Sequence, residues 1–179
     1  MNRFTAASIA GFGAAIAILI LSLLNNSQHA IVLIMAPFGA SCVLLFSLPA
    51  SPLARPSKVL GGHLLTASVG LLVQWLPLPL ELQLALGVGL AIALMQGLDL
   101  IHPPAGANPL LVLMTGQEWP FLWHTVLPGA LLLILLLAAA LAAGGYLTRP
   151  DEKAHEQNAT TVLSSTRGGF DISALIADK

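Results

Sequence analysis

Two residues able to exchange protons, Asp99 and His102, lie beside a run of prolines inside an apolar part of the sequence. The same stretch, LIHPPAGANPLLVLM at 100–114, contains Asn108, whose amide can donate and accept hydrogen bonds. Ionisable residues within apolar segments are candidates for function. We therefore predict that Asp99 and His102 act as a gate or proton relay. An interfacial pair that only caps the segment is the alternative.

The chain that must position these residues has the composition of a membrane protein. Of its 179 residues, 56% are hydrophobic and 8% are charged, whereas a soluble domain carries about 25% charged residues. Most of its apolar segments approach the length of about 20 residues that a membrane span requires. We expect an all-α membrane protein whose six spans are residues 4–24, 29–48, 59–76, 82–98, 101–115 and 121–145.

Several classes of function are disfavoured by the composition. The net charge is −1 and no basic run occurs, so nucleic acid is not expected as a partner. The single cysteine, Cys42, excludes an internal disulfide. We expect no enzymatic activity, because no nucleophile motif surrounds Ser41, although His102 could approach it. No cofactor is expected, and a metal site shared by His63, His124 and His102 is disfavoured. The first apolar segment is interpreted as a retained helix.

Basic residues indicate the orientation of the spans. With six crossings, all the basic residues that flank spans fall on one side, which the positive-inside rule assigns to the cytoplasm. Both termini are then cytoplasmic, and the polar residues 148–179 form a cytoplasmic tail. The flanking basic residues are Arg3, Arg55, Lys58, Arg149 and Lys153, and Glu81 and Glu118 fall on the opposite side.

A weak internal repeat divides the membrane region. Residues 37–48 align with 104–115 at an offset of 67, and the same offset places 59–65 on 126–132 with five of seven residues identical. Each half then holds three spans, an odd number, so the second half enters the membrane inverted. We predict two inverted three-span repeats, residues 4–76 and 82–145, with broken second and fifth spans. Such repeats are a recurring architecture of transporters.

The broken spans suggest a binding site near the middle of the membrane. Proline removes backbone donors and disfavours helix in the residue before it. Each short helix begins either at its proline, Pro37 or Pro104, or at a capping residue, Ser41 or Asn108. Unpaired N–H groups at two converging helix starts would attract a small anion, whereas close helix packing alone is the alternative. The predicted substrate-binding residues are Gly39, Ala40, Ser41, Gly106, Ala107 and Asn108.

The string HPPAGA resembles the signature of the HPP family of integral membrane proteins. The resemblance extends from APFGAS at 36–41 through HPPAGANPL at 102–110 to the final span, and the tail is not covered. It implies an HPP-type transmembrane domain over residues 1–147. Members from cyanobacteria and chloroplasts are implicated in nitrite transport, so the resemblance implies nitrite as a substrate. Its motif positions are His102, Pro103, Pro104, Ala105, Gly106 and Ala107.

These observations favour a membrane transport protein, channel or carrier, for a small inorganic monovalent anion, with nitrite as the first candidate. The expected location is a bacterial inner membrane, and the expected partners are the lipid bilayer and the anion. Six short spans leave little width for a sealed pathway, which makes a homo-oligomer an open alternative. A non-transporting scaffold or assembly subunit is the second interpretation, and an intramembrane enzyme is less favoured.

Overall fold

The structure describes residues 2–24 and 34–142, and all of the regular secondary structure in them is helical. The structure is a computed structural model, and the predicted tail lies outside the described residues. The elements in order are α1 (Arg3–Leu24), α2 (Ala36–Ser47), the 3-10 helix η1 (Pro52–Ala54), α3 (Pro56–Val73), α4 (Leu80–Gly97), the 3-10 helix η2 (Pro103–Ala107), α5 (Asn108–Thr115), α6 (Trp119–Phe121), the π-helical η3 (Leu122–Val126) and α7 (Leu127–Ala142).

Three helical stretches are long and apolar enough to cross a membrane. They are α1, α4 and the continuous stretch Trp119–Ala142 formed by α6, η3 and α7. Their bounds lie within three residues of the predicted spans 4–24, 82–98 and 121–145. α3 has 18 residues and begins three residues before its predicted span. The prediction of an all-α protein is confirmed.

The second and fifth predicted spans are shortened, as expected from their prolines. α2 has 12 residues and α5 has 8, which correspond to about 18 Å and 12 Å at roughly 1.5 Å per residue. A bilayer core is about 30 Å thick, so neither helix crosses it alone. Pro37 occupies the first turn of α2, and Pro103 and Pro104 open η2. Of the predicted second span, 29–33 lie outside the described residues.

The helix starts differ from one of the two predicted alternatives. Neither Ser41 nor Asn108 caps a helix. Ser41 lies inside α2, which begins at Ala36. Asn108 is the first residue of α5, whose N-cap position is Ala107, and no side chain caps this helix. A residue at a cap turns its side chain back to the amides of its own first turn. Here both side chains point away from those amides and into the protein, where hydrogen bonds to other helices hold them.

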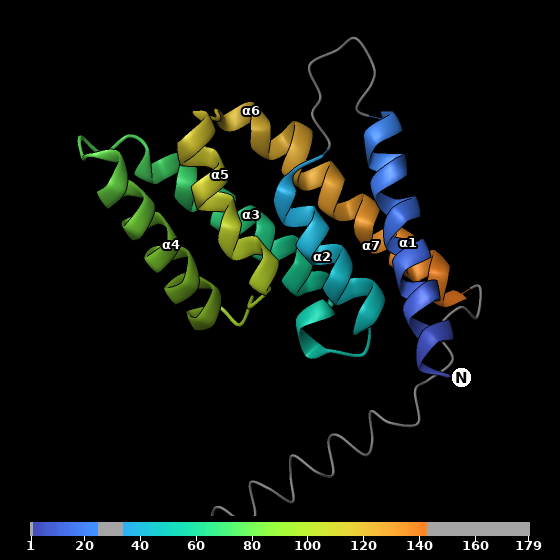
Figure 1. Cartoon of the computed structure of the whole chain (residues 1–179). Coiled ribbons are helices and arrows are strands. Elements are labelled where there is room, and N and C mark those ends of the chain that lie inside the picture. Colours follow the sequence, from blue (N-terminus) through green and yellow to red (C-terminus); the bar gives the residue numbers. More distant parts are fainter. Residues whose placement is uncertain (1, 25–33, 143–179) are drawn as a thin grey trace, which may run out of the picture. The chain divides into compact units, whose positions relative to one another are not determined.

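α3 lies at the centre of the described helices and packs against α4, α5 and α7 (Figure 1). α1 contacts α2 and α7, and α5 lies between α3 and α4. Glycines allow the close crossings. A Cβ atom added at Gly70 of α3 would lie 3.0 Å from the Pro109 Cα atom, and one at Gly87 of α4 would lie 3.2 Å from the Pro109 Cβ atom. The core of the described part therefore forms around α3 and α5.

Candidate functional site: a buried polar cluster between the two broken segments

Five polar side chains are completely buried where α2, α3 and the η2–α5 segment meet. All five have an exposed fraction of 0%. We call this group the polar cluster; its members are Ser41, His63, Thr66, His102 and Asn108. Burying polar groups away from water costs free energy unless each finds a hydrogen-bond partner. The bonds within the polar cluster therefore determine whether this arrangement is stable.

The Ser41 hydroxyl bridges the two histidines. Its Oγ atom lies 2.8 Å from Nε2 of His63 and 2.9 Å from Nε2 of His102. The hydroxyl has one proton, which it can donate either to a histidine or to the carbonyl oxygen of Pro37, 3.2 Å away and one turn earlier in α2. The two imidazole rings meet edge to face, with their centroids 5.0 Å apart. A side chain of the first broken segment thus contacts both α3 and the residue before η2.

Asn108 joins the second broken segment to the same histidine. Its Nδ2 atom lies 3.1 Å from Nδ1 of His63, and it donates to the His63 carbonyl oxygen at 3.0 Å and to Thr66 Oγ1 at 2.9 Å. Thr66 in turn donates to the carbonyl oxygen of Gly62. Among the described residues, the Asn108 Oδ1 atom is the buried side-chain acceptor without a hydrogen-bond partner. Such an atom requires a physical explanation.

When the histidines are neutral, their hydrogen-bond partners determine which nitrogen of each ring carries the proton. His102 Nδ1 lies 3.0 Å from the Leu53 carbonyl oxygen, which only accepts, so Nδ1 carries the proton and Nε2 accepts from Ser41. Asn108 offers an amide donor to His63 Nδ1, so the proton of His63 is on Nε2 and is donated to Ser41. The hydrogen bonds then run in one direction, from Asn108 through His63, Ser41 and His102 to Leu53.

Local sequence explains why these residues meet. His63 and Thr66 are three apart in α3 and therefore lie on one helix face. Gly62 lets the extended residues before η2 approach α3, because an added Cβ atom would lie 2.9 Å from the His102 Cβ atom and 3.0 Å from the Leu100 carbonyl oxygen. Glycine at position 62 is thus a condition for the contact between His102 and Ser41.

The predicted substrate-binding residues divide into two groups in the structure. Ser41 and Asn108 meet at His63, whereas Gly106 is half-buried and Gly39, Ala40 and Ala107 are exposed. Few of the amides expected to face an anion are free. Proline removes donors in both segments, and the amides of Phe38 and Ala105 bind the carbonyl oxygens of Met35 and His102 at 2.9 Å. These hydrogen bonds therefore favour a binding site made by side chains over one made by helix-end amides.

Asp99 and His102 are not brought together. The Asp99 carboxylate accepts from Lys58 Nζ at 2.7 Å; the Asp99 side chain is 86% exposed and that of Lys58 is 11% exposed. The hydrogen bond from Lys58, its positive charge and that of Arg55 lower the pKa of Asp99 from its ordinary value. Asp99 also adopts a left-handed backbone conformation, with φ of 52°, which aspartate tolerates better than most residues. Asp99 therefore forms an ion pair at the end of α4.

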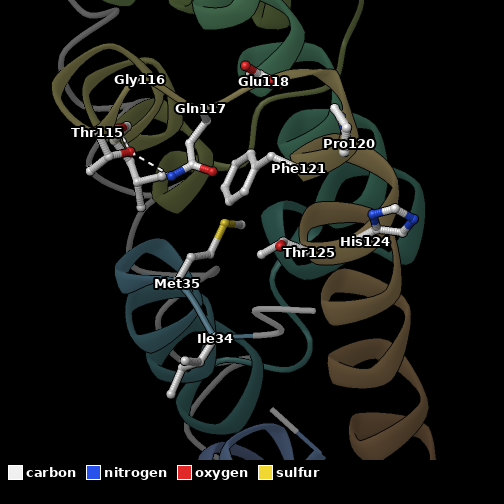
Figure 2. Close-up of a pocket in the computed structure, with 11 residues that line it drawn as sticks. Ile34, Met35, Thr115, Gly116, Gln117, Glu118, Pro120, Phe121, His124 and Thr125 are labelled. Atoms are coloured by element: carbon white, nitrogen blue, oxygen red, sulfur yellow. Dashed lines mark hydrogen bonds between the residues drawn. The ribbon is translucent and has the colours of Figure 1, made fainter. Parts of the chain in front are cut away.

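A separate pocket of about 440 Å³ lies beside the start of α2. Met35, Phe121 and Thr125 surround it in Figure 2, and Gln117 donates to Thr115 at 2.9 Å at one end. Its wall includes the π-helical turn of η3, where Pro128 lacks the N–H group that would bond the His124 carbonyl in an α-helix. No member of the polar cluster lines this pocket.

His63 and Thr66 are the functional candidates that sequence reasoning missed. From the sequence, His63 was a candidate only for a disfavoured metal site, whereas the structure puts it at the centre of the polar cluster. The available signal was the pair of polar residues at helical spacing within an apolar span. Within residues 2–24 and 34–142 no group of three metal-ligating side chains occurs. The expectation that no metal is bound remains a prediction.

The helices and their apolar surfaces define a multi-pass integral membrane protein. A family model described as HPP, transmembrane region, matches residues 1–149, so the chain belongs to that family and the resemblance of its HPPAGA string is confirmed. Two curated Dictyostelium discoideum proteins, each named only as a transmembrane protein, are similar. One is 35% identical over 103 residues, covering 53% of this chain and 36% of its own. The other is 33% identical over 123 residues, covering 64% and 40%.

The chain spans about two fifths of the length of these curated relatives. No solved structure matches the chain.

Proposed function

We propose that the chain is a transport protein for a small inorganic monovalent anion, with nitrite as the first candidate. The observation that carries the proposal is the polar cluster, which joins a side chain of each broken segment to one buried histidine. Ionisable and polar residues buried inside membrane proteins mark pathways of ions and solutes more often than they stabilise a scaffold. Nitrite is favoured by what the family resemblance implies, and channel and carrier both agree with the geometry.

The inverted repeat is part of this proposal, and the pattern of helix contacts supports it. A twofold relation that exchanges α1 with α4, α2 with the η2–α5 segment, and α3 with α7 pairs the main contacts. Under it α1·α2 corresponds to α4·α5, α3·α4 to α1·α7, and α3·α5 to α2·α7. The offset of 67 also relates Ser41 to Asn108. These two residues approach the two ring nitrogens of His63, as expected for a site on the symmetry axis.

The cluster contains neutral hydrogen-bond donors, which are engaged within its own network in this structure, and histidines able to become cationic. In the described part of the chain, no carboxylate hydrogen-bonds or pairs with Ser41, His63, His102 or Asn108, so no fixed negative charge contacts the site. Ser41 and Asn108 are proposed to bind the anion, with the neighbouring predicted positions lining its path. The Lys58–Asp99 pair is proposed as the gate at that end of α4, and His102 as part of a proton relay.

An intramembrane enzyme is the second candidate, and one observation favours it. Ser41 Oγ lies 2.9 Å from Nε2 of His102, and the Leu53 carbonyl orients the other ring nitrogen, as in a nucleophile activated by a base. However, Ser41 is fully buried and its oxygen already contacts three groups. Covalent labelling of Ser41 by a fluorophosphonate would favour the enzyme. A scaffold subunit is favoured if neither labelling nor flux is found.

The test is nitrite uptake into liposomes that contain the purified full chain. Asn108→Leu replaces the amide with an apolar side chain of similar size and so removes the donors to His63 and Thr66. This variant is expected to lose nitrite uptake. Gln96→Leu is the matched control, because this exposed glutamine of α4 lies outside the cluster, and its uptake should equal that of the unmodified protein. Normal uptake by a folded Asn108→Leu variant would reject the site, and no uptake by the unmodified protein would reject nitrite transport.

A further inference from the structure

We propose that His63, Ser41 and His102 form the proton-binding relay that couples a proton to the anion, and that the Ser41 hydroxyl turns when the proton is bound. The inference rests on the proposed function and extends it, because it assigns proton coupling to the buried histidine pair and not to Asp99. Four observations carry it: the bridging hydroxyl, the fixed proton positions, the isolation from other charges and the Pro37 carbonyl oxygen within reach of Ser41.

The bridging hydroxyl joins the two rings into one proton-binding unit. Ser41 can accept from one imidazole and donate to the other at the same time, and its Oγ atom is within 2.9 Å of both Nε2 atoms. When a proton is added at Nε2 of His102, that ring becomes an imidazolium and donates to Ser41 Oγ, which also accepts from Nε2 of His63. The product is a neutral His63 protonated on Nε2, an intact hydroxyl and a His102 imidazolium. One proton enters, and no other covalent bond changes.

The Ser41 hydroxyl must respond to this protonation. An Nε2 atom of His102 that carries a proton can no longer accept, so Ser41 turns its own proton to the carbonyl oxygen of Pro37, 3.2 Å away. The Ser41 oxygen then accepts from both imidazole rings. His63 Nδ1 stays an acceptor, so Asn108 keeps its hydrogen bonds to His63 and Thr66.

This protonation links proton binding to anion binding. Before the proton arrives, both histidines are neutral and the cluster has no positive charge to attract an anion. Afterwards His102 is an imidazolium, which favours a neighbouring anion. Proton and anion then bind together, and the buried site stays neutral. This avoids the high cost of burying a single uncompensated charge.

Within the described residues no carboxylate, lysine or arginine bonds to the relay, and Cys42, the neighbour of Ser41 on α2, is a buried free thiol. On α3 the nearest charged side chain is Lys58, which pairs with Asp99 at the end of α4. Arg55 precedes α3, and His124 of η3 is exposed at the separate pocket. α2, η2 and α5 carry no acidic residue and no lysine or arginine. The two histidines are therefore the groups that can hold the proton.

The first experiment measures nitrite accumulation in liposomes under an imposed pH gradient, alkaline inside, with flux through protein-free liposomes subtracted as permeation of nitrous acid. Coupling of one proton to one anion predicts about tenfold accumulation per pH unit, since one unit corresponds to about 1.36 kcal/mol. His63→Gln and Ser41→Ala are expected to lose this accumulation. Ser68→Ala is the matched control, because Ser68 also donates to a carbonyl four residues earlier but contacts no histidine. Accumulation retained by folded His63→Gln and Ser41→Ala variants would overturn the relay and leave the transport proposal intact.

The second experiment is independent of transport. Nitrogen-15 NMR of histidine-labelled protein is expected to show His102 protonated on Nδ1 and His63 on Nε2 at alkaline pH, with one proton taken up jointly by the pair on acidification. Ser41→Ala should separate the two titrations, and His124→Gln should leave them joined. If the unmodified protein moves no nitrite, transport is rejected and this result decides the relay alone. Two independent titrations in the unmodified protein would overturn it.

Discussion

A single histidine connects the two broken segments at the scale of residues. His63 has both ring nitrogens within hydrogen-bond distance of a partner, one from α2 and one from α5. Inside a membrane protein no bulk water is present to replace a lost partner, so the cluster is stable only while its network is complete. The unpaired Asn108 Oδ1 atom is the exception in the described cluster.

Asp99→Asn tests whether the exposed carboxylate or the histidine pair responds to protons. Lys58 first, with Arg55, holds the pKa of Asp99 below its ordinary value of 3.8, so Asp99 stays ionised at neutral and mildly acidic pH. We expect Asp99→Asn to keep the dependence of uptake on the pH gradient. Loss of that dependence would instead make Asp99 the relay, as the sequence first suggested.

The same variant has a predicted effect on stability. A lowered carboxyl pKa contributes stability above the unfolded pKa, and this contribution is lost as the pH falls through the folded value. The Asp99→Asn variant should therefore unfold at a lower temperature than the unmodified protein at pH 7, and the difference should disappear in strong acid. Asparagine tolerates the left-handed backbone at this position, so the comparison isolates the ion pair.

Sequence reasoning identified part of the cluster. Ser41 and Asn108 were found because the offset of 67 aligned them, and His102 because it lies beside two prolines. His63 and Thr66 were missed, since their role depends on residues 22 to 45 positions away in the chain. Local spacing contains no information about such contacts. Only the repeat, which relates distant segments, provided a long-range signal.

At the scale of elements, α5 is held between two helices by glycine. Gly70 of α3 and Gly87 of α4 both approach Pro109 at the start of α5. Glycine destabilises a helix by roughly 1 kcal/mol relative to alanine, so its use at a crossing is explained by the close approach it permits. The position of Asn108, one residue before Pro109, therefore depends on both crossings.

Gly70→Ala tests this dependence. The added Cβ atom would lie 3.0 Å from both the Pro109 Cα and the Val112 Cβ atoms, and overpacking of this kind typically costs about 1–3 kcal/mol. We expect a lower unfolding temperature in detergent and reduced nitrite uptake. Gly89→Ala is the matched control, because nothing lies within 4 Å of its added Cβ atom, and it should be neutral or stabilising by up to about 1 kcal/mol. Equal effects of the two substitutions would contradict the role given to the crossing.

The elements were predicted more accurately than their ends. Apolar length identified the spans, and proline density identified the two short helices. The expected caps at Ser41 and Asn108 were wrong, because serine and asparagine are also able to make tertiary hydrogen bonds, and here these bonds prevail. Helical turns begin at Pro103 as a 3-10 helix, one residue before the proline that the sequence offered as a helix start. Propensity does not distinguish a 3-10 turn from an extended segment this short.

At the scale of the whole molecule, the charged residues of the described part lie near the ends of helices. Arg3, Arg55 and Lys58 begin α1 or lie at the start of α3, and Figure 1 shows these helix ends on the same side of the described helices. Arg149 and Lys153 lie outside the described residues. Basic residues gathered on one side favour that side as cytoplasmic. This placement supports the proposed orientation, in which the start of α1 and the start of α3 face the cytoplasm.

Cysteine labelling tests this orientation in intact cells. Cys42 is buried at 2% exposure, and Cys42→Ala removes it as a competing thiol. In that background we expect Glu118→Cys to react with a membrane-impermeant maleimide from outside, and Arg55→Cys to react only after the membrane is opened. The two positions lie at opposite ends of the path formed by η2 and α5, so an inverted repeat requires opposite exposure. If both cysteines are labelled from the same side, the six-span arrangement is rejected. The proposed symmetry axis through the site at His63 is then rejected with it.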